Sequence, residues 1–235
     1  MQRYLWTLLV LCFWVTPQAA AASVLINEVD ADNYGSDTAE FIELFDGGTG
    51  GTALDGLVVV LYNGSTDTVY NRFDLAGYRT RDTGYFVLGG AAVSADFLIA
   101  ADSWLQNGAD AIALHEGSVL DFPTGNPVTT GNLIDALVYD TNDADDPGLL
   151  QLLNPGQPQI NEDEGGNAAL FSMQRYPDGS GGARNTTAYY LAEPTPGSSN
   201  GGIAAVPLPS SVMFLLSGLV GMVSVKRRKG TGQFH

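Results

Sequence analysis

Short apolar runs separated by glycine, asparagine and aspartate dominate the middle of this 235-residue chain. The runs are rich in Val, Ile, Leu, Tyr and Phe, which is the composition of β-strands, and no stretch shows a sustained helical repeat. We predict strands at residues 24–29, 40–45, 57–62, 69–73, 85–88, 111–115, 119–122, 133–139 and 170–175. The chain is therefore expected to be all-β.

Several short strands at this spacing favour a β-sandwich of the immunoglobulin type. Residues 58–62 are almost continuously apolar, which indicates a central strand covered on both faces. Asn63-Gly64 predicts a hairpin, because both residues accept the positive φ of a tight primed turn. Residues 96–106 are compatible with one or two turns of helix.

The first 22 residues have the three parts of a secretory signal peptide. A basic start contains Arg3, an apolar stretch covers residues 4–15, and small residues at 19–22 offer a cleavage site after Ala21 or Ala22. The only cysteine, Cys12, lies inside the apolar stretch. The exported protein is therefore expected to contain no disulfide, thiol nucleophile or cysteine-bound metal.

The other end of the chain carries a second targeting pattern. A linker at 201–205 is followed by a proline motif, an apolar run at 210–225, a basic cluster and a short tail at 230–235. The proline motif is Val206, Pro207, Leu208 and Pro209, and the basic cluster is Lys226, Arg227, Arg228 and Lys229. The apolar run is slightly shorter than the roughly 20 residues that span a bilayer comfortably, and the basic cluster is expected to stay cytoplasmic.

Residues 206–229 resemble a PEP-CTERM sorting signal in this order of motif, transmembrane helix and basic stop. Leu208 stands where that family usually has Glu. The resemblance implies transient anchoring in the inner membrane, processing by an exosortase, and a final place in the cell envelope or outside the cell. The alternative is a C-terminal anchor that is never cut.

The charge of residues 23–200 is strongly negative. All 26 acidic residues lie there, against five arginines and no lysine. Such a surface repels phosphate backbones, so nucleic acid is not an expected partner. It is soluble and attracts divalent cations or basic partners.

Residues 23–200 also contain ordered motifs that resemble a lamin-tail domain. The strand at 24–29 is followed by Glu-Phe-Ile-Glu-Leu at 40–44, and later motifs stand at 54–57, 107–114, 172–179 and 194–200. The resemblance implies an immunoglobulin-like β-sandwich that acts as a binding or tethering module on a secreted protein.

The residue inventory does not favour an enzyme. His115 is the single histidine of the domain, and serine-hydrolase, zinc-protease and phosphate-loop motifs are missing from the sequence. Glu40 and Glu43 are three residues apart on a predicted strand, where side chains point to opposite faces. Two alternatives remain: an accessory domain of an extracellular nuclease or phosphatase system, and a metal-dependent hydrolase with an unrecognised carboxylate site.

Three acidic loops, at 30–37, 140–146 and 161–164, are candidates for calcium, which binds six to eight oxygen ligands and suits flexible acidic loops. The candidate ligands are Asp30, Asp32, Asp37, Asp140, Asp143 and Asp145. The competing interpretation is that these Asp and Asn residues start turns by accepting hydrogen bonds from nearby backbone amides.

The sequence as a whole predicts an exported, non-catalytic surface or matrix protein that binds or scaffolds. Its expected partners are an exosortase-type processing enzyme, the membrane before processing, and polysaccharide or other surface proteins afterwards.

Overall fold

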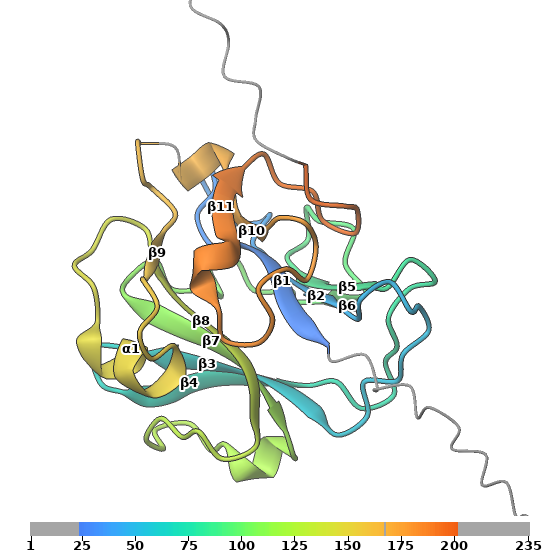
Figure 1. The fold of residues 1–235 in the computed structure, drawn as a ribbon, viewed down its shortest axis with the longest axis horizontal. Helices are drawn as coiled ribbons and strands as arrows, with labels where there is room; N and C mark the ends of the chain where they lie inside the picture. Colours follow the sequence, from blue (N-terminus) through green and yellow to red (C-terminus); the bar gives the residue numbers. More distant parts are fainter. Residues whose placement is uncertain (1–23, 167, 202–235) are drawn as a thin grey trace, which may run out of the picture.

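A computed structural model describes residues 24–166 and 168–201, which form two β-sheets with little helix (Figure 1). The six-stranded sheet has the order β11-β10-β1-β2-β5-β6. Its strands are β1 (Leu25–Asp30), β2 (Phe41–Phe45), β5 (Tyr85–Gly89), β6 (Phe97–Leu98), β10 (Ser172–Arg175) and β11 (Tyr189–Ala192).

The five-stranded sheet has the order β4-β3-β7-β8-β9. Its strands are β3 (Leu57–Asn63), β4 (Thr68–Asp74), β7 (Asp110–Glu116), β8 (Leu133–Asp140) and β9 (Ile160–Asn161). Neighbouring strands are antiparallel except at two edges, where β6 lies parallel to β5 and β9 parallel to β8. The predicted all-β, two-layer character is confirmed.

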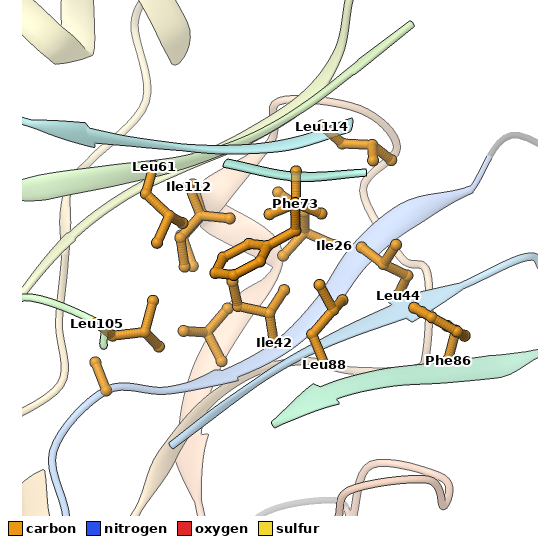
Figure 2. Packing of buried hydrophobic residues seen from close by; sticks show 14 of the residues in the cluster. Ile26, Ile42, Leu44, Leu61, Phe73, Phe86, Leu88, Leu105, Ile112 and Leu114 are labelled. Carbon is orange, nitrogen blue, oxygen red and sulfur yellow. The ribbon is translucent and has the colours of Figure 1, made fainter. Parts of the chain in front are cut away.

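The main core lies between the two sheets. Alternate residues of β3 point to opposite faces, so Val59 and Leu61 enter the main core while Val58 and Val60 face a second apolar cluster. Figure 2 shows Leu61 and Ile112 of the five-stranded sheet together with Ile42 and Leu88 of the other. The prediction that β3 is a central strand covered on both faces is confirmed.

The second cluster forms where helix α1 (Pro147–Leu153) covers the outer face of the five-stranded sheet. The Asp146 side chain caps the helix by accepting from the amides of Gly148 and Leu149 at 2.8 and 2.9 Å. Leu149 and Leu153 are the buried residues of the helix, and both pack into this cluster.

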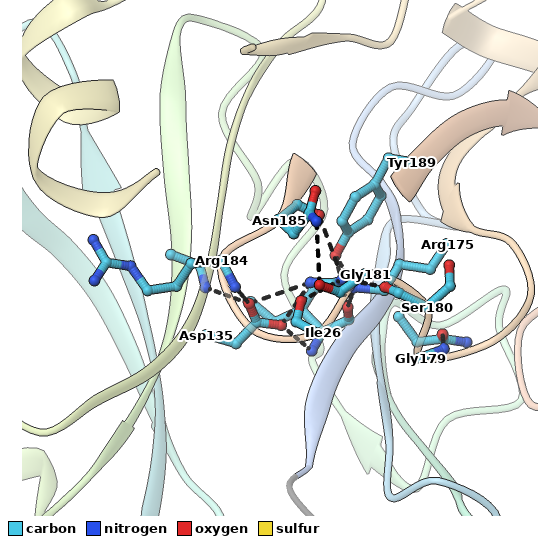
Figure 3. Close-up of polar contacts among 12 residues, drawn as sticks. Ile26, Asp135, Arg175, Gly179, Ser180, Gly181, Arg184, Asn185 and Tyr189 are labelled. Atoms are coloured by element: carbon cyan, nitrogen blue, oxygen red, sulfur yellow. Dashed lines mark hydrogen bonds and ion pairs between the residues drawn. The ribbon is translucent and has the colours of Figure 1, made fainter. Parts of the chain in front are cut away.

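A buried ion pair links the two sheets. Arg175 of β10 donates to both carboxylate oxygens of Asp135 of β8, at 3.2 and 3.0 Å, and neither side chain is exposed (Figure 3). Arg175 also donates to the carbonyls of Ser180 and Gly182, so one guanidinium orders the loop after β10. Burial raises the pKa of Asp135, but Arg175 and three backbone amides all donate to it, and we assign it the charged form.

Two local predictions are wrong, and a third is right only in part. Residues 119–122 are not a strand but contain the 3₁₀ helix η1 (Val119–Asp121), because Ser118 and Asp121 form a capping box. Residues 96–106 contain strand β6 instead of a helix. The β3–β4 hairpin exists, but its turn spans residues 64–67 with the positive φ at Asp67, and Asn63 accepts from the amide of Thr66.

The remaining elements are the 3₁₀ helices η2 (Ala168–Leu170) and η3 (Thr186–Ala188). Within the described ranges no helix has the length and apolar character needed to cross a membrane. The predicted leader at 1–22 and the predicted sorting signal at 206–229 lie outside the described residues.

Candidate functional site

Buried carboxylates of the six-stranded sheet hold the segment that leads to residue 201. Glu28 of β1 accepts from the amide and the hydroxyl of Thr195, at 2.8 and 2.9 Å. Glu43 of β2 accepts from the amide of Gly197 at 2.6 Å. Two further carboxylate contacts come from Asp178, which accepts from Ser199 Oγ at 2.6 Å and from the amide of Asn200 at 3.1 Å.

Asn200 completes this arrangement, which we call the exit clamp: Glu28, Glu43, Asp178 and Asn200. The Asn200 side chain is almost fully buried and donates to the carbonyl of Arg175 at 2.8 Å and to that of Asn27 at 3.3 Å. The last described residues are therefore fastened to strands β1, β2 and β10.

The clamp carboxylates have perturbed acidities. Burial raises the pKa of Glu43 to about 8, with the nearby charge of Glu28 adding to the effect and hydrogen bonds from Asn27 and Gly197 opposing it. Burial also raises the pKa of Glu28, against hydrogen bonds from Ser172 and Thr195. Both carboxyl groups have oxygens engaged in contacts that fix the chain.

Glu40 and Glu43 serve different parts of the fold. Glu40, just before β2, accepts from the amides of Trp104 and Leu105 at 2.7 and 3.3 Å, whereas Glu43 contacts Asn27 and the exit segment. Burial raises the pKa of Glu40 to about 8, and the two backbone amides oppose that shift. The two side chains contact different segments and do not form a carboxylate pair.

His115 lies in β7 and is fully buried. Its Nδ1 is 3.0 Å from the carbonyl oxygen of Gly131, which assigns the proton to Nδ1, and Nε2 then accepts from the Tyr62 hydroxyl at 3.2 Å. Burial lowers its pKa, so the ring is neutral near pH 7. Both ring nitrogens are engaged in structural contacts.

The acidic loops contain the turn contacts expected of Asp and Asn. In the first loop Asn33 donates its side-chain amide to Asp30 at 2.5 Å and its backbone amide to Asp37 at 3.1 Å. In the second loop Asp140 accepts from the amides of Asn142 and Asp143, at 2.8 and 3.0 Å. Asn161 plays the same part in the third loop, where its side chain accepts from the amide of Asp163 at 2.8 Å. The turn-forming role is confirmed.

The fold brings the first and third loops together. Glu162 is fully buried and accepts from the amide of Ala31 at 2.9 Å, and the charges of Asp30 and Asp32 act on the same carboxyl group. Burial raises the pKa of Glu162 well above its usual value and that of Asp30 to about 8. Burial also raises the pKa of Asp32, where the charges of Asp37 and Asp163 add to the shift.

Asp143 and Asp145 line a different feature, an open cleft of about 670 Å³ between the β3–β4 turn and the start of α1. Its other carboxylates are Asp67, Asp110 and Asp146. Burial raises the pKa of Asp110, with the charges of Asp143 and Asp146 adding to it, while the amide of Gly64 donates to this carboxylate at 2.8 Å. The predicted ligands of the first loop and those of the second loop thus lie in different places.

In the described part of the chain, no group of three or more Asp, Glu, His or Cys side chains is arranged to hold a metal ion. Two residues of interest near the first loop, Glu162 and Asn107, were not predicted as ligands. Glu162 stands in the third candidate loop and Asn107 outside all three loops, and the sequence does not show that either meets the first loop, because their partners lie 131 and 75 positions away along the chain.

Comparisons of this chain with models of known protein families, with curated proteins and with solved structures found no match.

Proposed function

We propose that this protein is an exported, non-catalytic binding or scaffolding module of the cell envelope or extracellular matrix. On this proposal its two sheets form an immunoglobulin-like sandwich of the lamin-tail type. The chain is held in the inner membrane by its C-terminal segment until an exosortase-type enzyme processes it.

The observation that carries the proposal is the exit clamp. A module displayed through its C-terminal segment must transmit load from that segment to its core. Glu28, Glu43 and Asp178 fasten residues 195–200 by five hydrogen bonds of 2.6 to 3.1 Å, immediately before the predicted linker at 201–205. This arrangement suits a domain that is carried on a C-terminal anchor.

The polar side chains of the described residues favour binding over catalysis. The buried histidine and the clamp carboxylates are engaged in structural contacts, as described above. The cleft beside α1 is lined by five carboxylates, of which Asp110 and Asp146 accept from backbone amides while Asp67, Asp143 and Asp145 are exposed. Such a surface suits a basic segment of a surface protein or the hydroxyl groups of a polysaccharide.

The sorting part of the proposal is tested by the intact mass of the full chain after export from a host that contains an exosortase. We expect the mature mass to lack the basic cluster 226–229, and the Pro207→Ala variant to retain it. A wild-type mature mass that includes the cluster would contradict processing.

The non-catalytic part is tested separately, with the same exported protein. We expect no magnesium- or manganese-dependent cleavage of DNA or phosphate esters. If such cleavage occurs and disappears in Glu28→Gln or Glu40→Gln, the protein is an enzyme and the non-catalytic proposal is wrong.

A further inference from the structure

We propose that Asp32, Asn107 and Glu162 hold a calcium ion where the first and third acidic loops meet. This proposal does not depend on the sorting or display function. It keeps Asp32 of the six aspartates predicted from the sequence and adds Asn107 and Glu162, which contact the same loop.

The first observation is that Glu162 and Asn107 both approach the loop that contains Asp32. Glu162 Oε1 accepts from the amide of Ala31 at 2.9 Å, which places this carboxyl group beside the turn that contains Asp32. Asn107 approaches Asp32 from the other direction, with Nδ2 3.4 Å from Asp32 Oδ1. The main chain of Asn107 is held in place by Thr141, whose amide and hydroxyl both donate to the Asn107 carbonyl.

The second step concerns oxygen atoms that the protein leaves unpaired. Glu162 Oε2 and Asn107 Oδ1 are both buried and have no hydrogen-bond partner among the described residues, while the backbone amide of Asp32, like that of Ala31, favours the charged form of the Glu162 carboxyl group. The Glu162 residue is entirely inaccessible to solvent. Buried polar atoms are normally paired, so two unpaired oxygens beside Asp32 indicate a positively charged ligand.

The third step is charge. No arginine among the described residues is hydrogen-bonded to these loops. Arg81 pairs with Asp96, and Arg175 pairs with Asp135. The other three donate elsewhere: Arg72 to Val119 and Thr124, Arg79 to Gly51, and Arg184 to Leu152 and Leu153. When the carboxyl groups of this region ionise, no arginine of the described residues is therefore placed to balance their charge.

The chemistry of the donors selects the ion. Carboxylate and amide oxygens suit a hard cation, and calcium also accepts carbonyl oxygens and water to complete six to eight ligands. With two carboxylates and one amide, the set needs no third acidic side chain. Few charged ligands correspond to weak binding, with a dissociation constant on the order of 10⁻⁴ to 10⁻³ M, as in extracellular modules.

The test is a thermal melt of the full chain in a non-ionic detergent, with 10 mM calcium chloride and with chelator. At roughly 10 to 100 times the dissociation constant, calcium should raise the Tm by about 3–10 °C. We expect the same rise in the control Asp145→Asn, whose side chain lies on the exposed second loop, and none in Glu162→Gln. No rise in the wild type, or an equal rise in Glu162→Gln, would overturn the proposal.

A second measurement covers the case in which Glu162→Gln does not fold. Asp32 is only partly buried, so Asp32→Asn is the milder variant. Trp104 lies in the same loop as Asn107 and serves as the donor for terbium luminescence. We expect luminescence that calcium displaces in the wild type and in Asp145→Asn and that Asp32→Asn reduces at least fivefold. Equal luminescence in all three would refute the site.

Discussion

Among substitutions that remove one charged side chain from the described part of the chain, Arg175→Met should be the most destabilising. The substitution leaves Asp135 with three backbone amide donors but no cation, in a position with no solvent exposure. It also removes the donors to the carbonyls of Ser180 and Gly182. Removing one partner of a buried pair costs about 3–5 kcal/mol, since the remaining charge is uncompensated.

The expected shift follows from the size of the domain. One kcal/mol corresponds to roughly 2–4 °C in Tm for a domain of 150–250 residues, so Arg175→Met should lower the Tm by about 6–20 °C. Urea unfolding of the full chain in non-ionic detergent gives the free energy directly. Met keeps most of the aliphatic volume, so the loss reports the guanidinium and not a large cavity.

Arg81→Met is the matched control. Arg81 also forms an ion pair, with Asp96 at 2.9 Å, but the two side chains are 30% and 25% exposed. Pairs that water can reach contribute about 0–1 kcal/mol. If Arg175→Met costs no more than Arg81→Met, the inference that a buried pair joins the two sheets is refuted.

Three further changes have defined outcomes. Because burial raises the pKa of Glu43 from 4.5 to about 8, the native state binds more protons than the unfolded chain between these pH values, and stability should fall as the pH rises through this range. The unfolding free energy of Glu43→Gln, measured with urea, should therefore fall less steeply with pH than that of the wild type; an identical pH dependence would contradict this. Leu61→Ala should cost about 2–5 kcal/mol in the same assay, while Leu120→Ala, at a side chain that is 81% exposed, should stay within about 0.5 kcal/mol. A Cβ on Gly64 would meet a backbone oxygen at 2.0 Å, so Gly64→Ala should lower stability by about 1–3 kcal/mol. Gly131→Ala is the control, because the nearest atom to a Cβ there is at 3.4 Å, and it should not lower stability. Equal Tm values for the two variants would contradict this.

The strands that carry the core could be predicted because their sequences determine them locally. The continuous apolar run of β3 reports burial on both faces, and that run can be read without knowing which strands cover it. Strands β6, β9 and β11 were not predicted. They have only two to four residues and pair at or near the sheet edges, so tertiary contacts and not composition decide them.

Local polar chemistry explains the predictions that were wrong. The apolar content of residues 119–122 predicts a strand, but the side chains of Ser118, which precedes them, and Asp121, which lies among them, accept from backbone amides and favour a short helix. Gly64 was expected to supply a positive φ. Its actual role is close approach, since a side chain there would collide with the carbonyl of Ala109. Neither contact is visible in a hydrophobic pattern.

The acidic loops were predicted as loops but not as neighbours. Turn formation depends on contacts two to four positions along the chain, which a sequence displays. The meeting of Glu162 with Ala31 depends on how the two sheets pack, because these residues follow β9 and β1 of different sheets, so the sequence cannot place it. The same holds for Thr195 and Glu28, which are 167 positions apart and together build the exit clamp.

The five arginines explain why so acidic a domain still has ordered loops. Each of them donates to at least one backbone carbonyl: Arg72 to Val119, Arg79 to Gly51, Arg81 to Ser94, Arg175 to Ser180 and Gly182, and Arg184 to Leu152 and Leu153. A guanidinium can do this because it presents several donors in a fixed plane. The guanidinium groups of the domain therefore stabilise its loops through hydrogen bonds to backbone carbonyls. Most surface carboxylates keep their negative field, which attracts cations and basic partners and opposes self-association. An ion bound at Glu162 would then supply at the loops the compensation that the arginines do not.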